Sequence, residues 1–98
     1  MITFECAVDG KDETVPLPDD VGSVLNLMQY KLVIGLNFTG PDECYIDVYP
    51  QDKKIVLGNA VLYMAPIYTR DKAIENLCQW VRDGCIPRDE SNSGVGDG

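Results

Sequence analysis

The sequence predicts an α+β fold in which a mostly antiparallel sheet carries a C-terminal helix packed on one face. Three observations support this prediction. Residues 2–8 and 44–49 alternate between the two faces of a strand, and Asp9-Gly10 is typical of a tight hairpin. An apolar stripe at helical spacing is formed by Ala73, Ile74, Leu77, Cys78 and Val81. The expected order of elements is β-β-α-β-β-β-β-α. Residues 1–88 should form a single domain, because 98 residues is close to the usual size of one domain.

The first two strands are expected to form a hairpin. In residues 2–8, large apolar side chains occupy every second position, as on one face of a half-buried strand. Asp9-Gly10 then fits a type I′ turn, which needs positive φ at both central residues. The returning strand covers residues 12–17, and Pro16 within it predicts an edge position, because proline has no N–H to donate.

A short helix is expected over residues 19–30. Asp19-Asp20 suits its start, because an aspartate can cap a helix and complements the positive end of the helix dipole. Apolar side chains follow at i, i+3, i+4 and i+7, namely Val21, Val24, Leu25 and Met28.

Four strands are expected next, arranged as an antiparallel meander. They cover residues 32–38, 44–49, 53–57 and 60–68. A turn at residues 39–42 separates the first two, and Gly58-Asn59 is a second hairpin signal between the last two. Pro66 indicates that the last strand ends in an unpaired or bulged segment.

The last helix is the clearest element, and it is expected to cover one face of the sheet. Thr69 can cap its first turn, and Gly84 suits the position just after its end. Trp80 borders its apolar stripe and is predicted to anchor the core. Residues 89–98 consist largely of Ser, Gly and acidic residues, and they are predicted to form a disordered tail.

Composition disfavours several classes of partner. The chain has 16 Asp and Glu against 8 Lys and Arg, a formal net charge of −8, which disfavours direct binding to nucleic acid or anionic membranes. Its apolar runs are far shorter than the roughly 20 residues that span a bilayer. Its first residues also lack the basic and apolar regions of a signal peptide. We therefore expect a cytoplasmic protein with no membrane partner.

The four cysteines are expected to be reduced side chains and not metal ligands. They are Cys6, Cys44, Cys78 and Cys85. They show no C-x-x-C spacing, and the chain contains no histidine to complete a mixed site. Cys85, just past the last helix, is expected to be the most exposed thiol. Neither a metal nor another cofactor is predicted.

No enzymatic activity is predicted. The absence of histidine removes the commonest general base, and with it Ser-His-Asp and Cys-His catalysis. The sequence contains no phosphate-binding loop, dinucleotide-binding motif or nucleophile elbow. Cys78 and Cys85 are poor candidate nucleophiles, because one lies within a helix and the other beyond a helix C-terminus.

Negative charge is concentrated in the first half of the chain. Residues 1–47 carry nine carboxylates and two lysines, a net charge of −7, whereas residues 48–88 carry four carboxylates and six basic residues, a net charge of +2. This asymmetry predicts a surface that binds a basic protein; ordinary solvated turn residues are the alternative interpretation. The predicted binding residues are Asp9, Asp12, Glu13, Asp19, Asp20, Asp42, Glu43 and Asp47.

Two tyrosines are further candidates for binding the partner. Tyr45 and Tyr49 share a strand face with Asp47, opposite the apolar face of the same strand. If that face is exposed, it resembles the hot spot of a protein interface, where tyrosine supplies a large contact area. The alternative is that a second helix covers it.

In size and charge, the chain resembles the small acidic inhibitors of phages and other mobile elements, which include DNA mimics and anti-CRISPR proteins. The resemblance implies an inhibitor that docks an acidic face on a basic, nucleic-acid-handling protein. The alternative is a structural or assembly subunit, which would form a homo-oligomer or part of a larger complex through an edge strand or the tyrosine face.

Overall fold

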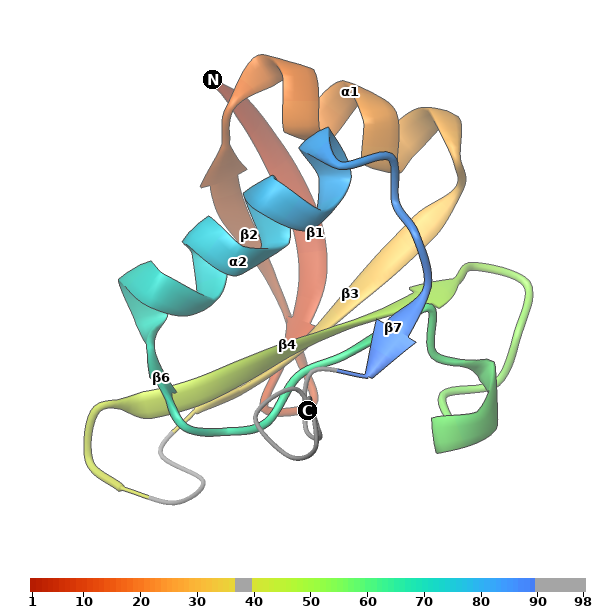
Figure 1. The fold of residues 1–98 in the computed structure, drawn as a ribbon. Helices are drawn as coiled ribbons and strands as arrows, with labels where there is room; N and C mark the ends of the chain where they lie inside the picture. Colours follow the sequence, from red (N-terminus) through yellow and green to blue (C-terminus); the bar gives the residue numbers. More distant parts are fainter. Residues whose placement is uncertain (37–39, 90–98) are drawn as a thin grey trace, which may run out of the picture.

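The computed structural model describes residues 1–36 and 40–89, and it confirms the α+β class (Figure 1). In their order across the sheet, the strands are β2 (Lys11–Leu17), β1 (Ile2–Val8), β3 (Tyr30–Leu36), β4 (Glu43–Pro50), β5 (Leu62–Tyr63) and β7 (Arg88–Asp89). A further strand, β6 (Tyr68–Thr69), also pairs with β4. Helix α2 (Arg70–Arg82) packs across one face of the sheet, as predicted, and α1 (Asp19–Leu27) contacts both α2 and the sheet. The strands and helices follow each other in the predicted order through α2, although the two strands before α2 are not at the predicted positions.

The first hairpin is confirmed. Strands β1 (Ile2–Val8) and β2 (Lys11–Leu17) pair along their whole length. Asp9 and Gly10 have φ of 53° and 82°, the two positive values that a type I′ turn requires. β2 lies at the edge of the sheet, as Pro16 within it indicates.

Helix α1 is shorter than predicted. It ends at Leu27, and Gln29 adopts a positive φ of 59° that turns the chain directly into β3 (Tyr30–Leu36). The cap position falls on Pro18, so the predicted capping by an aspartate side chain is wrong. Asp19 and Asp20 occupy the first turn instead, where their charge still complements the helix dipole.

The sheet is mixed, although most of its pairings are antiparallel. β3 pairs with β4 (Glu43–Pro50) antiparallel from end to end. β1 and β3 run parallel and pair at only two positions, Ala7 with Val33 and Val8 with Ile34. Among the described residues, four of the six strand pairings are antiparallel. Residues 37–38 of the predicted third strand lie outside the described residues.

The predicted meander after β4 is wrong. Residues 53–57 form no strand, and Gly58-Asn59 lies in a short 3₁₀ helix, η1 (Leu57–Asn59), instead of a hairpin. The predicted strand over residues 60–68 is reduced to β5 (Leu62–Tyr63) and β6 (Tyr68–Thr69). Both pair directly with β4, so they occupy the edge that residues 53–57 would need.

A last strand, β7 (Arg88–Asp89), pairs parallel with β5. Asp89 therefore belongs to the sheet, and the prediction that the tail begins at residue 89 is wrong. The remainder of the predicted tail, residues 90–98, lies outside the described residues.

Helix α2 and the turn after it close the core. Thr69 Oγ1 accepts the Lys72 N–H at 3.2 Å, and Gly84 has a φ of 103°, so both predicted ends are confirmed. Trp80 is fully buried, as predicted, and its Nε1 donates to the Ile86 carbonyl at 2.6 Å. The same turn carries Cys85 back into the core, so the expectation of an exposed thiol there is wrong.

Candidate functional site

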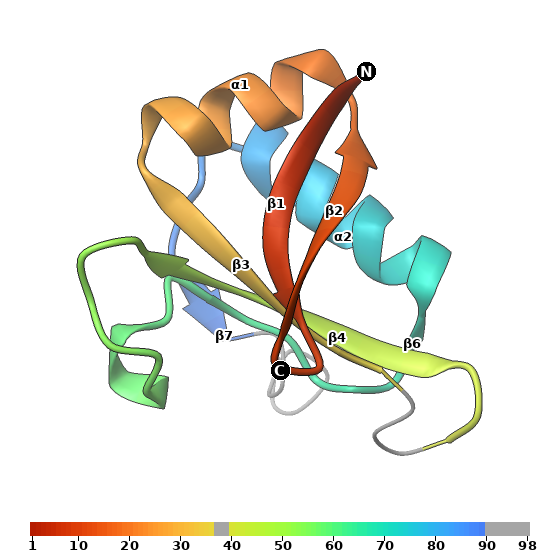
Figure 2. The same ribbon diagram turned by 180° about the vertical axis from the view of Figure 1, so that it is seen from behind.

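The tip of the β1–β2 hairpin and residues 40–42, which lead into β4, lie at the same end of the molecule (Figure 2). Leu36 N, at the end of β3, donates a 2.9 Å hydrogen bond to Asp9 Oδ1 in the hairpin tip. Asp42 and Glu43 line a hollow of about 200 Å³ together with Leu36 and Arg70. Both acidic segments therefore flank Leu36. We call their carboxylates, with the two that follow the tip on β2, the acidic end: Asp9, Asp12, Glu13, Asp42 and Glu43.

The acidic end carries negative charge that its basic neighbours do not cancel. Lys11 follows the hairpin tip and Arg70 lines the hollow, so five carboxylates face two basic residues, a net charge of −3. Asp12 and Asp42 are exposed. No ion pair within the described residues engages either of them. These two carboxylates are therefore accessible to a cation from a partner.

Glu5 is absent from the predicted binding residues, yet it extends this surface. It lines a hollow of about 180 Å³ with Asp12 and Glu13 along the edge strand β2. The hairpin register pairs Glu5 with Thr14, two residues from Asp12, and so brings the two carboxylates onto one face. Alternation within β1 could have identified Glu5, because it lies on the polar face of that strand.

Asp19 and Asp20 lie at the opposite end of the hairpin and do not join the acidic end. The seven residues of β2 separate them from the tip by about 20 Å. Asp19 pairs with the N-terminal ammonium at 2.8 Å, and Asp20 pairs with Arg82 at 3.0 Å. The Arg82 guanidinium holds the pKa of Asp20 below its usual range, mainly through a hydrogen bond. Both aspartates thus fix local structure near α1.

Tyr45, Asp47 and Tyr49 do share one face of β4, but that face is covered. Asp47 and Tyr49 are each only 4% exposed, and Tyr45 is half-buried. The cover is not a second helix. It is the segment after β4, which forms with these three residues a pocket of about 300 Å³. We call it the tyrosine pocket; its lining residues are Tyr45, Asp47, Tyr49, Leu57, Tyr63, Met64 and Pro66.

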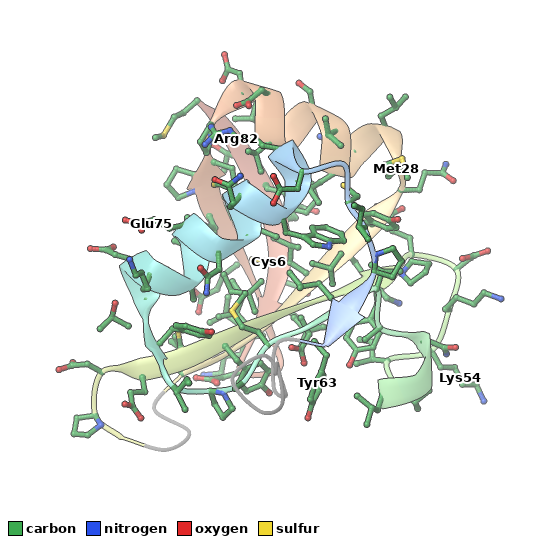
Figure 3. The ribbon with its side chains drawn as sticks, in the orientation of Figure 1. Cys6, Met28, Lys54, Tyr63, Glu75 and Arg82 are labelled. Carbon is green, nitrogen blue, oxygen red and sulfur yellow. The ribbon has the colours of Figure 1, made fainter. Side chains whose placement is uncertain are left out.

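The tyrosine pocket depends on a glycine in the neighbouring strand. Gly35 is paired with Tyr45, and a Cβ atom at position 35 would collide with the Tyr45 ring. The missing side chain therefore lets the ring lie close against β3. Tyr63, from β5, lies on the side of the molecule away from α1 (Figure 3).

Asp47 connects the pocket to the backbone of the covering segment. Its Oδ1 accepts a hydrogen bond from the N–H of Met64 at 3.0 Å. Met64 lies in the segment between β5 and β6, the two short strands that pair with β4. The carboxylate thus accepts a backbone hydrogen bond from the segment that joins the two strands paired with β4. Both Asp47 and Met64 are buried, so this bond is shielded from water.

The charge of Asp47 acts on the tyrosines around it. Burial raises the pKa of Tyr45 and of Tyr49, and the negative charge of Asp47 raises both further. Both phenols are therefore neutral at physiological pH. The charge of Asp9 also raises the pKa of Tyr45. The Tyr45 ring lies against Gly35, and the N–H of the next residue, Leu36, donates to Asp9 Oδ1, so the tyrosine pocket adjoins the acidic end.

Tyr63 is a member of the pocket that the sequence did not single out. Its place follows from the pairing of Val48 with Leu62, which sets Tyr63 beside Asp47. That pairing could not be predicted while residues 53–57 were expected to be the partner of β4.

A loop beside the pocket exposes three consecutive hydrophobic side chains. Ile55, Val56 and Leu57 are 51%, 52% and 60% exposed, and we call them the apolar loop. Hydrogen bonds fix the segment around them: Lys31 Nζ donates to the Lys53 carbonyl at 2.8 Å, and Asn59 Nδ2 to the Lys54 carbonyl at 3.0 Å. A run of exposed hydrophobic residues on an ordered loop is typical of an interaction site.

In the part of the chain that the structure describes, no three Cys, Asp or Glu side chains converge in a way that could hold a metal ion. The helices found there are all too short or too polar to cross a membrane. Burial raises the pKa of all four thiols.

Comparisons with models of protein families, with curated proteins and with solved structures found no match. No relative therefore assigns a role to any of these surfaces.

Proposed function

We propose that this protein is a small non-enzymatic binding protein that docks its acidic end on a basic protein partner. The observation that supports the proposal is the gathering of five carboxylates, from the hairpin and from the β3–β4 turn, with a net charge of −3. A surface of one sign attracts a partner of the opposite sign, accelerates their encounter and disfavours partners of like charge.

A partner that handles nucleic acid fits this surface best. Such proteins line their grooves with Lys and Arg side chains that contact phosphates. The two carboxylates that share a face of the hairpin, Glu5 and Asp12, present negative charge to the same side chains. A protein seated in such a groove would exclude nucleic acid, so we propose an inhibitory role. The proposal agrees with the resemblance in size and charge to inhibitors from phages and mobile elements.

Capture from a bacterial lysate tests this function. The tagged wild-type protein is compared with the variant D12N/E13Q/D42N, which raises the charge of the acidic end by three units. The variant leaves Asp9 and Glu43 in place, because Asp9 holds Leu36 N and Glu43 lies within β4. The matched control is D52N/E75Q/D83N, with the same charge change at exposed positions elsewhere. The D83N change in this control keeps a side-chain oxygen that can accept from Gln79 Nε2.

We expect the wild type and the control to recover the same basic, nucleic-acid-handling protein, and the acidic-end variant to recover about tenfold less of it. Added duplex DNA or RNA should displace the captured partner, because both ligands would compete for one groove. Equal recovery by all three proteins would contradict the proposal.

A second candidate function is assembly into a homo-oligomer, and the apolar loop is the observation that favours it. Three exposed hydrophobic side chains on an ordered loop could be buried against a second copy. Mass in solution distinguishes the candidates. A concentration-dependent dimer that the variant V56D abolishes would support the oligomer, whereas a monomer at all concentrations would exclude it.

A further inference from the structure

We propose that an extended segment of the partner protein, carrying a lysine or arginine, inserts between β1 and β3 and hydrogen-bonds to the backbone edge of β1. The hollow that would receive it has a volume of about 450 Å³, and residues 3–7 of β1 and 30–33 of β3 form its two sides. We call it the strand groove. That the segment belongs to the partner rests on the proposed function, whereas the groove itself follows from the pairing of the strands.

The strand groove exists because β1 and β3 separate. Each of them pairs with its other neighbour along its whole length, β1 with β2 and β3 with β4. With each other they pair at only two positions, near the hairpin tip, and from there they diverge toward α1 (Figure 2). Among the described residues, no pairing joins residues 2–6 to β3. The sheet is therefore open between two strands that are both fixed on their far sides.

The backbone of β1 points into the strand groove. Thr3 pairs with Pro16, which has no N–H, so this pair cannot exchange hydrogen bonds and the backbone groups of Thr3 point away from β2. Bonded and non-bonded pairs alternate along an antiparallel ladder, so Glu5 and Ala7 point the same way. Ala7 indeed pairs with Val33 of β3. The N–H and C=O groups of Thr3 and Glu5 are therefore directed toward the groove.

The opposite side of the strand groove presents a second backbone edge. Tyr30 pairs with Pro50, so by the same alternation Tyr30 and Leu32 direct their backbone groups toward β1. The Tyr30 carbonyl accepts a 3.1 Å hydrogen bond from Gln51 Nε2, a side-chain amide in the place of a strand backbone. An extended peptide matches such edges best, because its own N–H and C=O groups continue the ladder. The open stretch, residues 2–6, spans about 13 Å, the length of five extended residues.

Charge in the strand groove favours a basic segment. Glu5 and Asp12 line it and share one face of the hairpin. Lys31 lies on the other side, but its Nζ donates to the carbonyls of Gln51 and Lys53 at 3.3 and 2.8 Å. A lysine or arginine of the segment would therefore meet two carboxylates. Asp12 also belongs to the acidic end, so a partner docked there lies beside the strand groove.

Selection of peptides tests the strand groove without knowledge of the partner. A displayed library of random seven-residue peptides is selected on the immobilised protein, and the enriched peptides are synthesised. We expect peptides that contain a lysine or arginine, and at least tenfold weaker binding when their backbone amides are N-methylated. Hydrogen exchange of the Thr3, Glu5 and Leu32 amides should slow at least tenfold when a peptide is bound.

Three variants assign the binding to the strand groove. T3P removes an N–H that faces the groove. T14P is the matched control, because Thr14 pairs with Glu5 and therefore directs its N–H to the outer edge of β2. T3P should weaken peptide binding at least tenfold and T14P less than twofold, whereas E5Q should weaken it at least threefold. If T3P does not fold, E5Q and the N-methylated peptides decide the result.

Enrichment of no peptide would overturn the inference, and so would equal binding by T3P and T14P. Peptides whose binding neither E5Q nor N-methylation weakens would also overturn it. A dimer that T3P abolishes would identify a second copy of the chain as the occupant, against the inference.

These outcomes are separate from those of the capture experiment. Capture that depends on the acidic end, with no enriched peptide, would reject the strand groove as a binding site and leave the proposed function standing. Peptides bound in the groove without such capture would reject the proposed function and leave the groove as a peptide site.

Discussion

Asp47 is the predicted binding residue that the structure places farthest from solvent. It was predicted as one of eight carboxylates that bind the partner, but it is buried and accepts a hydrogen bond from the backbone of Met64. A buried carboxylate in the middle of a sheet is expensive unless it is hydrogen-bonded. The bond from Met64 contributes to the tolerance of Asp47 at this buried position.

Replacing Asp47 should therefore measure the contribution of this bond. D47A leaves the buried N–H of Met64 without an acceptor, and it should lower the free energy of unfolding by about 1–3 kcal/mol. D47N keeps an acceptor and should cost clearly less. Urea denaturation of the two variants checks the prediction. Equal stability of D47A and D47N would show that the Met64 hydrogen bond does not contribute.

Cys85 is the second residue whose environment differs from expectation. The turn after α2 gives it a positive φ of 57° and leaves it 7% exposed, and burial raises the pKa of its thiol. The raised pKa lowers the fraction of the thiol that is present as the reactive thiolate, and burial limits the access of reagents to it.

We therefore expect Cys85 to resist alkylation by iodoacetamide at pH 8 in the folded protein. All four cysteines should react in 6 M guanidinium chloride, because unfolding exposes them. Peptide mass spectrometry measures modification at each position. Rapid modification of Cys85 under native conditions, at the rate of a free cysteine, would contradict the buried position.

At the scale of elements, the sequence predicts best those strands and helices whose defining signals lie within the element itself. The first hairpin follows from Asp9-Gly10 and from the alternation before it, and α2 follows from its stripe, Thr69 and Gly84. In both cases the interactions that define the element join residues close together in the chain.

The segment between β4 and α2 could not be predicted in the same way. Residues 53–57 read as a strand, but their conformation is set by contacts far along the chain, such as the bond from Lys31 Nζ to the Lys53 carbonyl. β5 and β6 are each two residues long, too short for an alternation to be recognised. The tyrosine pocket lies against this segment, so its existence could not be predicted from the sequence either.

The close contact between Gly35 of β3 and the Tyr45 ring of β4 should make position 35 intolerant of a larger residue. A methyl group at position 35 collides with the Tyr45 ring, so G35A should lower the free energy of unfolding by about 1–3 kcal/mol. Y45L removes the ring atoms that cause the collision. The double variant G35A/Y45L should therefore be less destabilised than the sum of the two single variants.

Thermal or urea denaturation of the four proteins in this cycle measures the coupling between the two positions. Additive effects of G35A and Y45L would mean that the ring does not lie over Gly35. That result would also remove the geometric basis of the tyrosine pocket.

At the scale of the whole molecule, the fold divides the acidic half of the chain into three groups. Asp19 and Asp20 pair with cations near α1, and Asp47 is buried in the sheet. The remaining five predicted carboxylates form the acidic end. Charge counted along the sequence could not show this division, because only the register and topology show which carboxylates share an end.

The measurement that tests the central claim most directly is the salt dependence of association with the partner recovered by capture. Surface charges are screened over about 10 Å at 0.1 M salt and over about 3 Å at 1 M. We predict that the association rate of the wild type and of D52N/E75Q/D83N falls at least tenfold between about 50 mM and 500 mM salt, whereas that of D12N/E13Q/D42N is slower at low salt and changes much less. Identical rates and identical salt dependence for all three proteins would contradict docking through the acidic end.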